Sequence, residues 1–465
     1  MAAGARTGVT GNGAAGPVAF WITAAILVWA PLFRGGNRPL PLLVLECLAL
    51  AGVATLVASR PLREAFSVKA PLLRWALAIL VAVPVLQLVP LPYALWSALP
   101  GHGPYAAALE GAGVATGWRP LSMHARATEF SWLALLPCVA IFLLVSQLGR
   151  RQLRTLVMVF VAVALAEAVL GILQTGAGRD SALQLGNKFA GSGATGTYVN
   201  RNHFGGLMAM ALPVLVAVWA SATLPTRDSS GEILRAHPRH ADARLARRLA
   251  WSLAVALALA ALLFSRSRAA IGFGLLAFGA TSLALVWSAA THRVRAALGV
   301  VAVVAFLLAA YAGLTPIVER FSPDDLSLGY AGRLELAGAA LAAGFDFLPF
   351  GSGLGTFGDV FQRYQHEGLV GYVDHAHNDY AEAFVELGVA GLAVIVLMAG
   401  AVLARWGAIA RGVVSRSLGT LQIAAGFSVL ALALHGIFDF NFHIPANAVY
   451  FAFLAGVFFY EPRQA

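Results

Sequence analysis

The sequence has little charge for its length. Its 465 residues are 59% hydrophobic and only 12% charged, and the mean hydropathy is +0.76. Soluble domains carry roughly twice that charged fraction, so a soluble globular protein is excluded. Apolar runs of about 20 residues, the length that an α-helix needs to cross a bilayer, recur along the chain. The sequence therefore predicts an all-α, polytopic membrane protein.

Cysteine is almost absent, and the two that occur, Cys47 and Cys138, both fall inside apolar runs. We interpret them as small packing residues and expect neither a disulfide nor a metal site from them. A cleavable signal peptide is not expected either, because the apolar run from Val18 to Phe33 continues without a small-residue cleavage site.

Several catalytic motifs are also missing. There is no Gly-rich Walker loop, no zinc-type His/Cys spacing, no Gly-x-Ser-x-Gly elbow and no Asp-x-Asp pair. These absences disfavour chemistry on ATP or on nucleotide sugars. We expect no cofactor and no metal.

Charge patterning assigns sides to about twelve predicted spans. The spans lie near 18–33, 40–58, 72–90, 129–147, 155–173, 203–222, 250–264, 270–289, 297–314, 384–404, 419–437 and 445–460. Arginines and lysines concentrate in alternate loops, which the positive-inside rule places in the cytoplasm together with both termini. The net charge of +10 is therefore mainly a topology signal, and nucleic-acid binding is not expected.

The other side of the membrane carries the longer loops, at 91–128, 174–202 and 315–383, and short ones at 265–269 and 438–444. We treat residues 1–465 as a single integral membrane domain, with 315–383 as a large outer loop inserted before the tenth span. Within that loop the residue pattern predicts a helix over Gly332–Phe345, a Gly-rich turn in "PFGSGLGTF" and a short helix over Asp359–His366. An interspan loop of this size with internal structure is usually functional.

Four arginines lie at outer, membrane-facing edges: Arg201, Arg266, Arg268 and Arg333. Arg268 is expected at a helix start, where backbone N–H groups also favour anions. Because arginine binds phosphate through two parallel hydrogen bonds, the set would suit a lipid-linked pyrophosphate. The alternative is that each arginine snorkels or pairs with a nearby acid.

A second candidate group is histidine-rich. His377 can act as a general base near neutral pH, with Asp379 or Glu382 orienting its ring. The alternative is a capping histidine at a helix start. The final outer turn, "HGIFDFNFHIP", adds His435, Asp439 and His443, and ionisable groups at such depth are usually functional.

The stretch His377-Asn378, nine residues, then Gly388-x-x-Gly391 resembles the signature His-[Asn/Ser/Gln]-x9-Gly-x-x-Gly of bacterial O-antigen ligases and their relatives. Agreement extends to "LQLVPLP" at 86–92, to "NRNHFGG" with Asn202 and His203, to "SRA" at 267–269, to the stretch from Arg333 and to "HGIFDFNFHIPANA". His375 lies outside the signature. The resemblance covers most of the chain.

The resemblance implies a membrane-embedded glycosyltransferase of the GT-C-like type. Such an enzyme is metal-independent and inverting, and it acts on the periplasmic face of the bacterial inner membrane. It transfers a glycan from undecaprenyl pyrophosphate to a sugar hydroxyl of lipid A–core. His377 then matches the family's essential base, and Arg201 and Arg268 match its donor-binding arginines, which can replace a metal at the pyrophosphate. Arg266 has no clear counterpart.

Other functions stay open at this point. Wzy-type polysaccharide polymerases and protein O-oligosaccharyltransferases resemble the ligases and use similar donors with different acceptors, and we favour the ligase. A lipid-linked glycan transporter would carry buried charges in many spans and broken helices in matching halves. A structural scaffold would not need these arginines and histidines.

Overall fold

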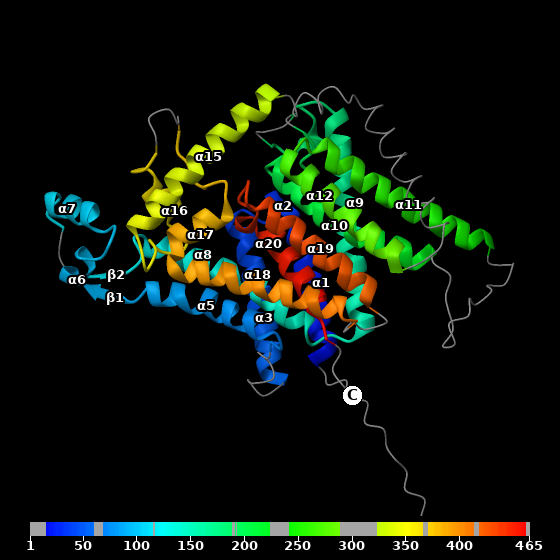
Figure 1. Ribbon diagram of the computed structural model, residues 1–465, viewed down its shortest axis with the longest axis horizontal. Helices are drawn as coiled ribbons and strands as arrows, with labels where there is room; N and C mark the ends of the chain where they lie inside the picture. Colours follow the sequence, from blue (N-terminus) through cyan, green and yellow to red (C-terminus); the bar gives the residue numbers. More distant parts are fainter. Residues whose placement is uncertain are drawn as a thin grey trace, which may run out of the picture.

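The computed structural model describes residues 15–59, 68–114, 117–187, 191, 193–223, 241–288, 323–365, 371–412 and 418–461. This part of the chain is mainly helical (Figure 1). Its α-helices are α1 (Ala15–Trp29), α2 (Leu32–Gly35), α3 (Pro39–Ser59), α5 (Pro71–Gln87), α6 (Tyr93–Ser97), α7 (Gly103–Gly111), α8 (Ala125–Val145), α9 (Arg150–Gly176), α10 (Arg201–Thr223), α11 (Ala241–Phe264), α12 (Arg268–Ser288), α15 (Pro323–Asp346), α16 (Phe357–Phe361), α17 (Asp379–Leu387), α18 (Val389–Ala410), α19 (Gly419–His435) and α20 (Pro445–Phe458). Two 3₁₀ turns, η1 (Ala182–Gln184) and η4 (Asn441–His443), and an antiparallel pair, β1 (Pro90–Pro92) and β2 (Trp118–Pro120), complete it.

The predicted membrane helices are present. Seven helices are long and apolar enough to cross a bilayer, namely α3, α8, α9, α10, α11, α12 and α18. The shorter apolar helices α1, α5, α19 and α20 coincide with four more predicted spans. The predicted span at 297–314 lies outside the described residues. These apolar helices confirm an all-α, membrane-type architecture. Helices suit a bilayer because they satisfy their own backbone hydrogen bonds in lipid.

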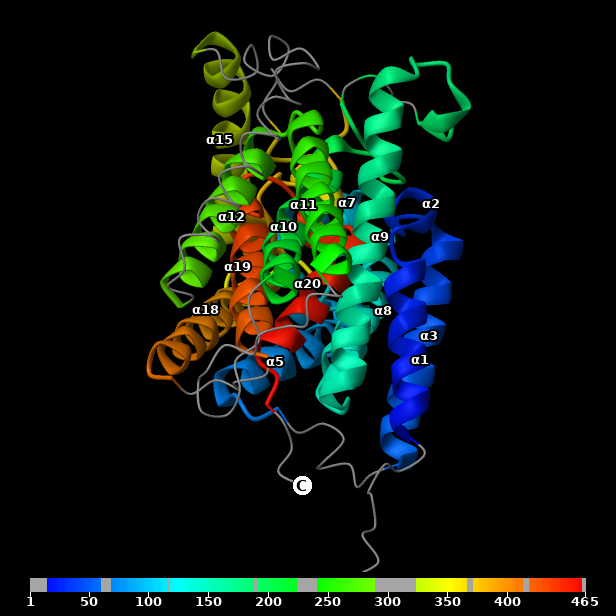
Figure 2. The same cartoon turned by 90° about the vertical axis from the view of Figure 1, so that its right-hand side faces the viewer.

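Helix α10 is the centre of the bundle. Its apolar window is 89% buried, and it packs against α11, α12 and α19. Two glycines allow the close approach: Gly205 faces Ala270 at the start of α12, and Gly206 faces Asn441 in the turn after α19. Small residues of this kind let backbones approach within a membrane bundle. Around this centre, α1, α3 and α9 run side by side (Figure 2).

The two ends of the bundle differ in charge. At one end Lys69 and Arg405 pair with Glu461, and Gln152 beside the Arg150–Arg151 pair hydrogen-bonds Gly16. At the opposite end the described loops carry the histidines and buried acids of 375–387 and 435–443. These two regions thus differ in residue type, and the assignment of the loops to the two sides of the membrane stays a prediction.

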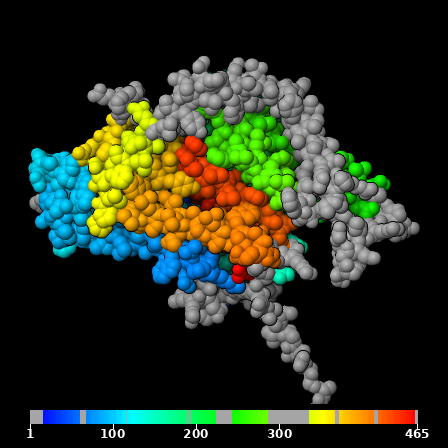
Figure 3. All heavy atoms as spheres, viewed as in Figure 1, coloured from blue at the N-terminus to red at the C-terminus, as the bar shows by residue number. Residues whose placement is uncertain are grey.

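The large outer loop folds around a small core of its own. Leu336 and Ala340 of α15, and Phe347 directly after it, pack with Phe357 and Val385. Residues of the 90–124 segment join this core, since His102 and Tyr105 contact Phe347 and the Tyr105 hydroxyl donates to the Val360 carbonyl. Figure 3 shows α15, in yellow, beside this segment at one edge of the molecule. We call the assembly of residues 90–124, 335–365 and 371–387 the outer lobe.

Three local expectations need correction. The helix predicted over Gly332–Phe345 is longer and starts at Pro323, because Pro and two acids suit a first helical turn. The short helix predicted over Asp359–His366 is instead α16, Phe357–Phe361. The span predicted at 384–404 is two helices, which meet at Gly388.

Candidate active site

The first turn of α10 is held from two sides. Buried Glu167 of α9 accepts hydrogen bonds from the backbone N–H and the hydroxyl of Thr197, both at 2.8 Å. The side chain of Asn200 then accepts from the backbone N–H of Asn202, at 2.8 Å, as in a helix cap. These contacts fix the segment "NRNH", so Arg201, Asn202 and His203 start the helix at a defined position.

His377 occupies a sharp turn directly before α17. Its φ is +50°, a left-handed conformation that non-glycine residues adopt rarely and mostly at special sites. Asn378 follows as the N-cap, and its side-chain oxygen accepts from the N–H groups of Tyr380 and Ala381, each at 3.0 Å. The asparagine of the signature is therefore the cap that ends the turn and starts the helix.

At both glycines of the signature, close contacts with the backbone leave no room for a side chain. Gly388 joins α17 to α18 with φ +58° and ψ −133°, and a β-carbon there would overlap the Pro349 carbonyl. At Gly391 a β-carbon would overlap the Ala383 carbonyl. The signature thus packs α17 tightly against α18 and the Gly-rich turn.

The turn between α19 and α20 brings a buried carboxylate to His377. Nδ1 of His377 lies 3.4 Å from Oδ1 of Asp439, and Nε2 of His203 lies 3.7 Å from the same oxygen. The other oxygen accepts from the Asn202 side chain at 2.6 Å. Asp439 is fully buried, whereas the His377 side chain keeps 34% of its surface exposed. One carboxylate therefore orients groups from two other segments.

The charge of Asp439 is stabilised where it lies. Burial alone would raise the pKa of Asp439, but the surrounding imidazoles of His203, His377 and His435 hold it well below its usual value. The carboxylate is therefore ionised at neutral pH and acts only as an acceptor.

A phenylalanine of the same turn lies among three histidine rings. Phe440 is edge-on to His203 and His377, with ring centroids 4.7 and 4.9 Å apart, and stacks on His375 at 4.2 Å. This contact fixes ring positions without adding polar groups.

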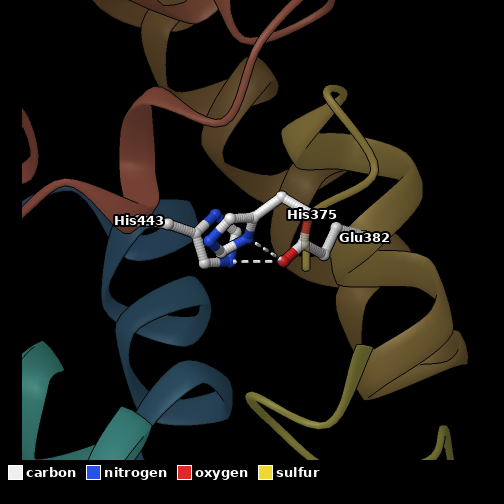
Figure 4. Close-up of side chains that lie close together, drawn as sticks. All are labelled: His375, Glu382 and His443. Carbon is white, nitrogen blue, oxygen red and sulfur yellow. Dashed lines mark hydrogen bonds and ion pairs between the residues drawn. The ribbon is translucent and has the colours of Figure 1, made fainter. Parts of the chain in front are cut away.

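A second carboxylate cluster lies beside the first. Glu382 Oε1 is 2.8 Å from Nδ1 of His375 and 3.2 Å from Nε2 of His443 (Figure 4). Nδ1 of His443 lies 3.1 Å from Oδ1 of Asp379. The remaining Glu382 oxygen accepts from the Ala376 N–H at 2.9 Å. The cluster ties together the loop before His377, α17 and the turn after α19.

The atoms of His375, Glu382 and His443 lie within 4.8 Å of one another, so they can in principle hold a metal ion. Spacing along the sequence does not predict this group, because two of its members come from residues 375–382 and the third from a distant turn.

Charges in this cluster depend on one another. Burial raises the pKa of Asp379 to about 6, and burial with the neighbouring Glu382 raises that of Glu386 to about 7. For Glu382, burial is outweighed by His443 and His375, which lower its pKa. Burial would lower the pKa of His443, but the carboxylates of Glu382, Asp379 and Glu386 raise it to about 10. The His443–Asp379 pair is therefore ionised between about pH 6 and 10.

The structure brings together most of the predicted site residues. Asn202, His203, His375, His377, Asn378, Asp379, His435, Asp439 and His443 all belong to these two clusters or border them. Arg268 is the first residue of α12, as expected, and Arg201 is the first residue of α10. The two helix starts are neighbours, since Gly205 faces Ser267 and Ala270. Arg266 lies in the preceding turn with φ +53°. Arg333 lies on α15, and its side chain is outside the described residues.

Sequence reasoning missed Phe440, Gln87 and Glu386. Buried Gln87 donates to the carbonyls of Phe350 and Glu386 and accepts from the Leu354 N–H. Its side chain thereby joins the end of α5 to the Gly-rich turn and to α17. Gln87 and Phe440 both lie in stretches that carried the resemblance, so those stretches were the available signal.

The fold and its apolar helices define a multi-pass helical membrane protein. Residues 253–396 match the family model described as O-antigen ligase, in agreement with the resemblance. The matched segment includes Arg266, Arg268 and the signature from His377 to Gly391. No curated protein matches the chain.

Proposed function

We propose that the protein is an O-antigen ligase. It transfers a glycan from undecaprenyl pyrophosphate to a sugar hydroxyl of lipid A–core, at the periplasmic face of the bacterial inner membrane. The observation that carries this proposal is the left-handed His377 held against buried Asp439 inside the family signature.

In this mechanism the Nδ1–H of His377 faces the Asp439 carboxylate as a hydrogen-bond donor, which leaves Nε2 as the base. Nε2 takes the proton of the acceptor hydroxyl while its oxygen bonds to the anomeric carbon. The bond from that carbon to the pyrophosphate breaks on the opposite face, so the configuration inverts. The lipid pyrophosphate leaves with the bonding electron pair.

Arg201 and Arg268 supply the charge that the leaving group needs. They start two adjacent helices, α10 and α12, where backbone N–H groups add to the positive potential. Two guanidinium groups can stabilise the developing pyrophosphate charge without a metal. Arg266 and Arg333 are the further candidates for this donor site.

A deletion strain tests the proposal. Lipopolysaccharide core without any O-chain is the expected result, and wild type should restore the full ladder. His377→Ala should insert normally but reduce transfer by about 10²–10⁴-fold, the usual effect of removing a general base. The matched control is His124→Ala, because His124 also pairs with a carboxylate, Asp359, but lies half-exposed on the outer lobe. If the core of the deletion strain instead bears one repeat unit, the protein is a polymerase.

A further inference from the structure

His443 is surrounded by acids. Asp379 and Glu382 of α17 contact its two ring nitrogens, and Glu386 of the same helix adds a longer-range attraction. From the loop before α17 the ring of His375 lies 4.8 Å away, centroid to centroid. These are the titratable groups that face His443 among the described residues.

The geometry sets the protonation state of the ring. A carboxylate oxygen can only accept a hydrogen bond, and both nitrogens of His443 face carboxylate oxygens. Both nitrogens must therefore carry a proton, and the ring is an imidazolium cation. It is the centre of a chain that runs from Asp379 through His443 and Glu382 to His375.

This chain connects the two segments that form the proposed base. Glu382 holds His375 and the Ala376 N–H, the residues just before His377. Asp379 accepts from the Phe442 N–H and donates its own N–H to the Gly436 carbonyl, so it holds the turn that carries Asp439. His443 lies between these two carboxylates.

We propose that protonated His443 is a positioning residue, which locks the turn carrying Asp439 onto the loop carrying His377. The inference rests on the proposed function, because it concerns the distance between the base and its orienting carboxylate. Neither His443 nor Glu382 contacts the reacting atoms in this scheme.

Distances favour the hydrogen-bonded lock over a metal at the same atoms. Zinc ligands at about 2.0–2.2 Å in a tetrahedron lie about 3.3 Å from one another. The His375 Nδ1 to Glu382 Oε1 distance is 2.8 Å, which instead fits a charge-assisted N–H···O⁻ bond. A metal would also need the lone pair of His443 Nε2, which the imidazolium lacks.

The test compares His443→Gln with His443→Lys in purified protein, with an in vitro transfer assay. Glutamine keeps the size but loses the charge, and kcat should fall by up to about 10²-fold, the effect of a misplacement near 1 Å. KM for the donor should change little, since the arginines are untouched. His443→Lys should recover part of kcat because it restores a cation. Asp359→Asn, which breaks an exposed His–Asp pair, is the matched control.

Thermal unfolding against pH gives an independent readout. The pKa of His443 is raised to about 10 from an ordinary 6.5. Its charge therefore stabilises the fold fully below about pH 6.5, and this contribution is lost as pH rises through 10. The Tm difference between wild type and His443→Gln should be largest near pH 6.5 and shrink toward pH 10.

The outcomes separate cleanly. If His443→Gln keeps the wild-type kcat while His377→Ala is inactive, the lock is wrong and the proposed function stands. If His377→Ala turns over like wild type, the proposed function itself is wrong. Loss of wild-type activity in EDTA, restored by Zn²⁺ and accompanied by loss of bound zinc in His443→Gln and Glu382→Gln, would replace the lock with a metal site.

Discussion

At the scale of single residues, Asp439 joins several segments of the described site. It contacts His377, His203 and Asn202 with two oxygens, and all three come from other segments. A buried carboxylate is costly unless hydrogen bonds and positive charge compensate it. These side chains and the Phe440 N–H, which donates to Oδ1 at 3.0 Å, contribute to that compensation, so the need to satisfy one charge also fixes the ring of the proposed base.

Asp439→Asn should separate this orienting role from simple packing. The amide is nearly the same size but can present an N–H to His377, which favours the wrong tautomer. We expect kcat to fall on the order of 10²–10⁴-fold with a much smaller effect on donor KM. Steady-state kinetics with purified donor would check this. A rise in donor KM at unchanged kcat would place Asp439 in the donor site instead.

At the scale of elements, the junction between α17 and α18 explains why the signature contains Gly388. One helix ends and the next begins at a single residue, Gly388, where an added β-carbon would overlap the Pro349 carbonyl and the Gly351 nitrogen. The site-bearing helix α17 is thereby held against both the Gly-rich turn and a membrane helix.

Gly388→Ala should destabilise the fold by about 1–3 kcal/mol, because alanine disfavours this conformation and its β-carbon overlaps backbone. Gly272→Ala is the matched control. Gly272 lies within α12 with open space where a β-carbon would be, and alanine there should be neutral or stabilising. Thermal unfolding of both variants in the same detergent measures the difference. Equal Tm values would show that the junction adapts easily.

Elements were also the scale at which sequence reasoning worked best. Long apolar runs predict helices because lipid leaves the backbone no other partner, and α12 starts at Arg268, as expected. The break at Gly388 was not expected, because hydropathy continues through it. The His375–Glu382–His443 cluster could not be predicted. His443 lies 61 positions after Glu382 in the sequence, and only tertiary packing brings the two together. The roles of His377 and the arginines came from the resemblance.

At the scale of the whole molecule, the two ends of the bundle should face different compartments. After replacing Cys47 and Cys138 with alanine, Trp118→Cys and Lys69→Cys give single thiols at opposite ends. Both positions are exposed, with 69% of Trp118 and 62% of the Lys69 side chain accessible. An impermeant thiol reagent should label only the Trp118→Cys variant in cells with a permeabilised outer membrane. Labelling of only the Lys69→Cys variant would invert the orientation.

Helix α18 has a further consequence. Among the described residues only 11% of its apolar window is buried and its main partner is α5, so it presents a large apolar surface suited to contact with lipid. Gly388 joins this helix to α17, which begins two residues after His377. If His377 is the base, a change in bilayer thickness that displaces α18 would reach it through this junction. We therefore expect turnover in lipid vesicles to depend on acyl-chain length.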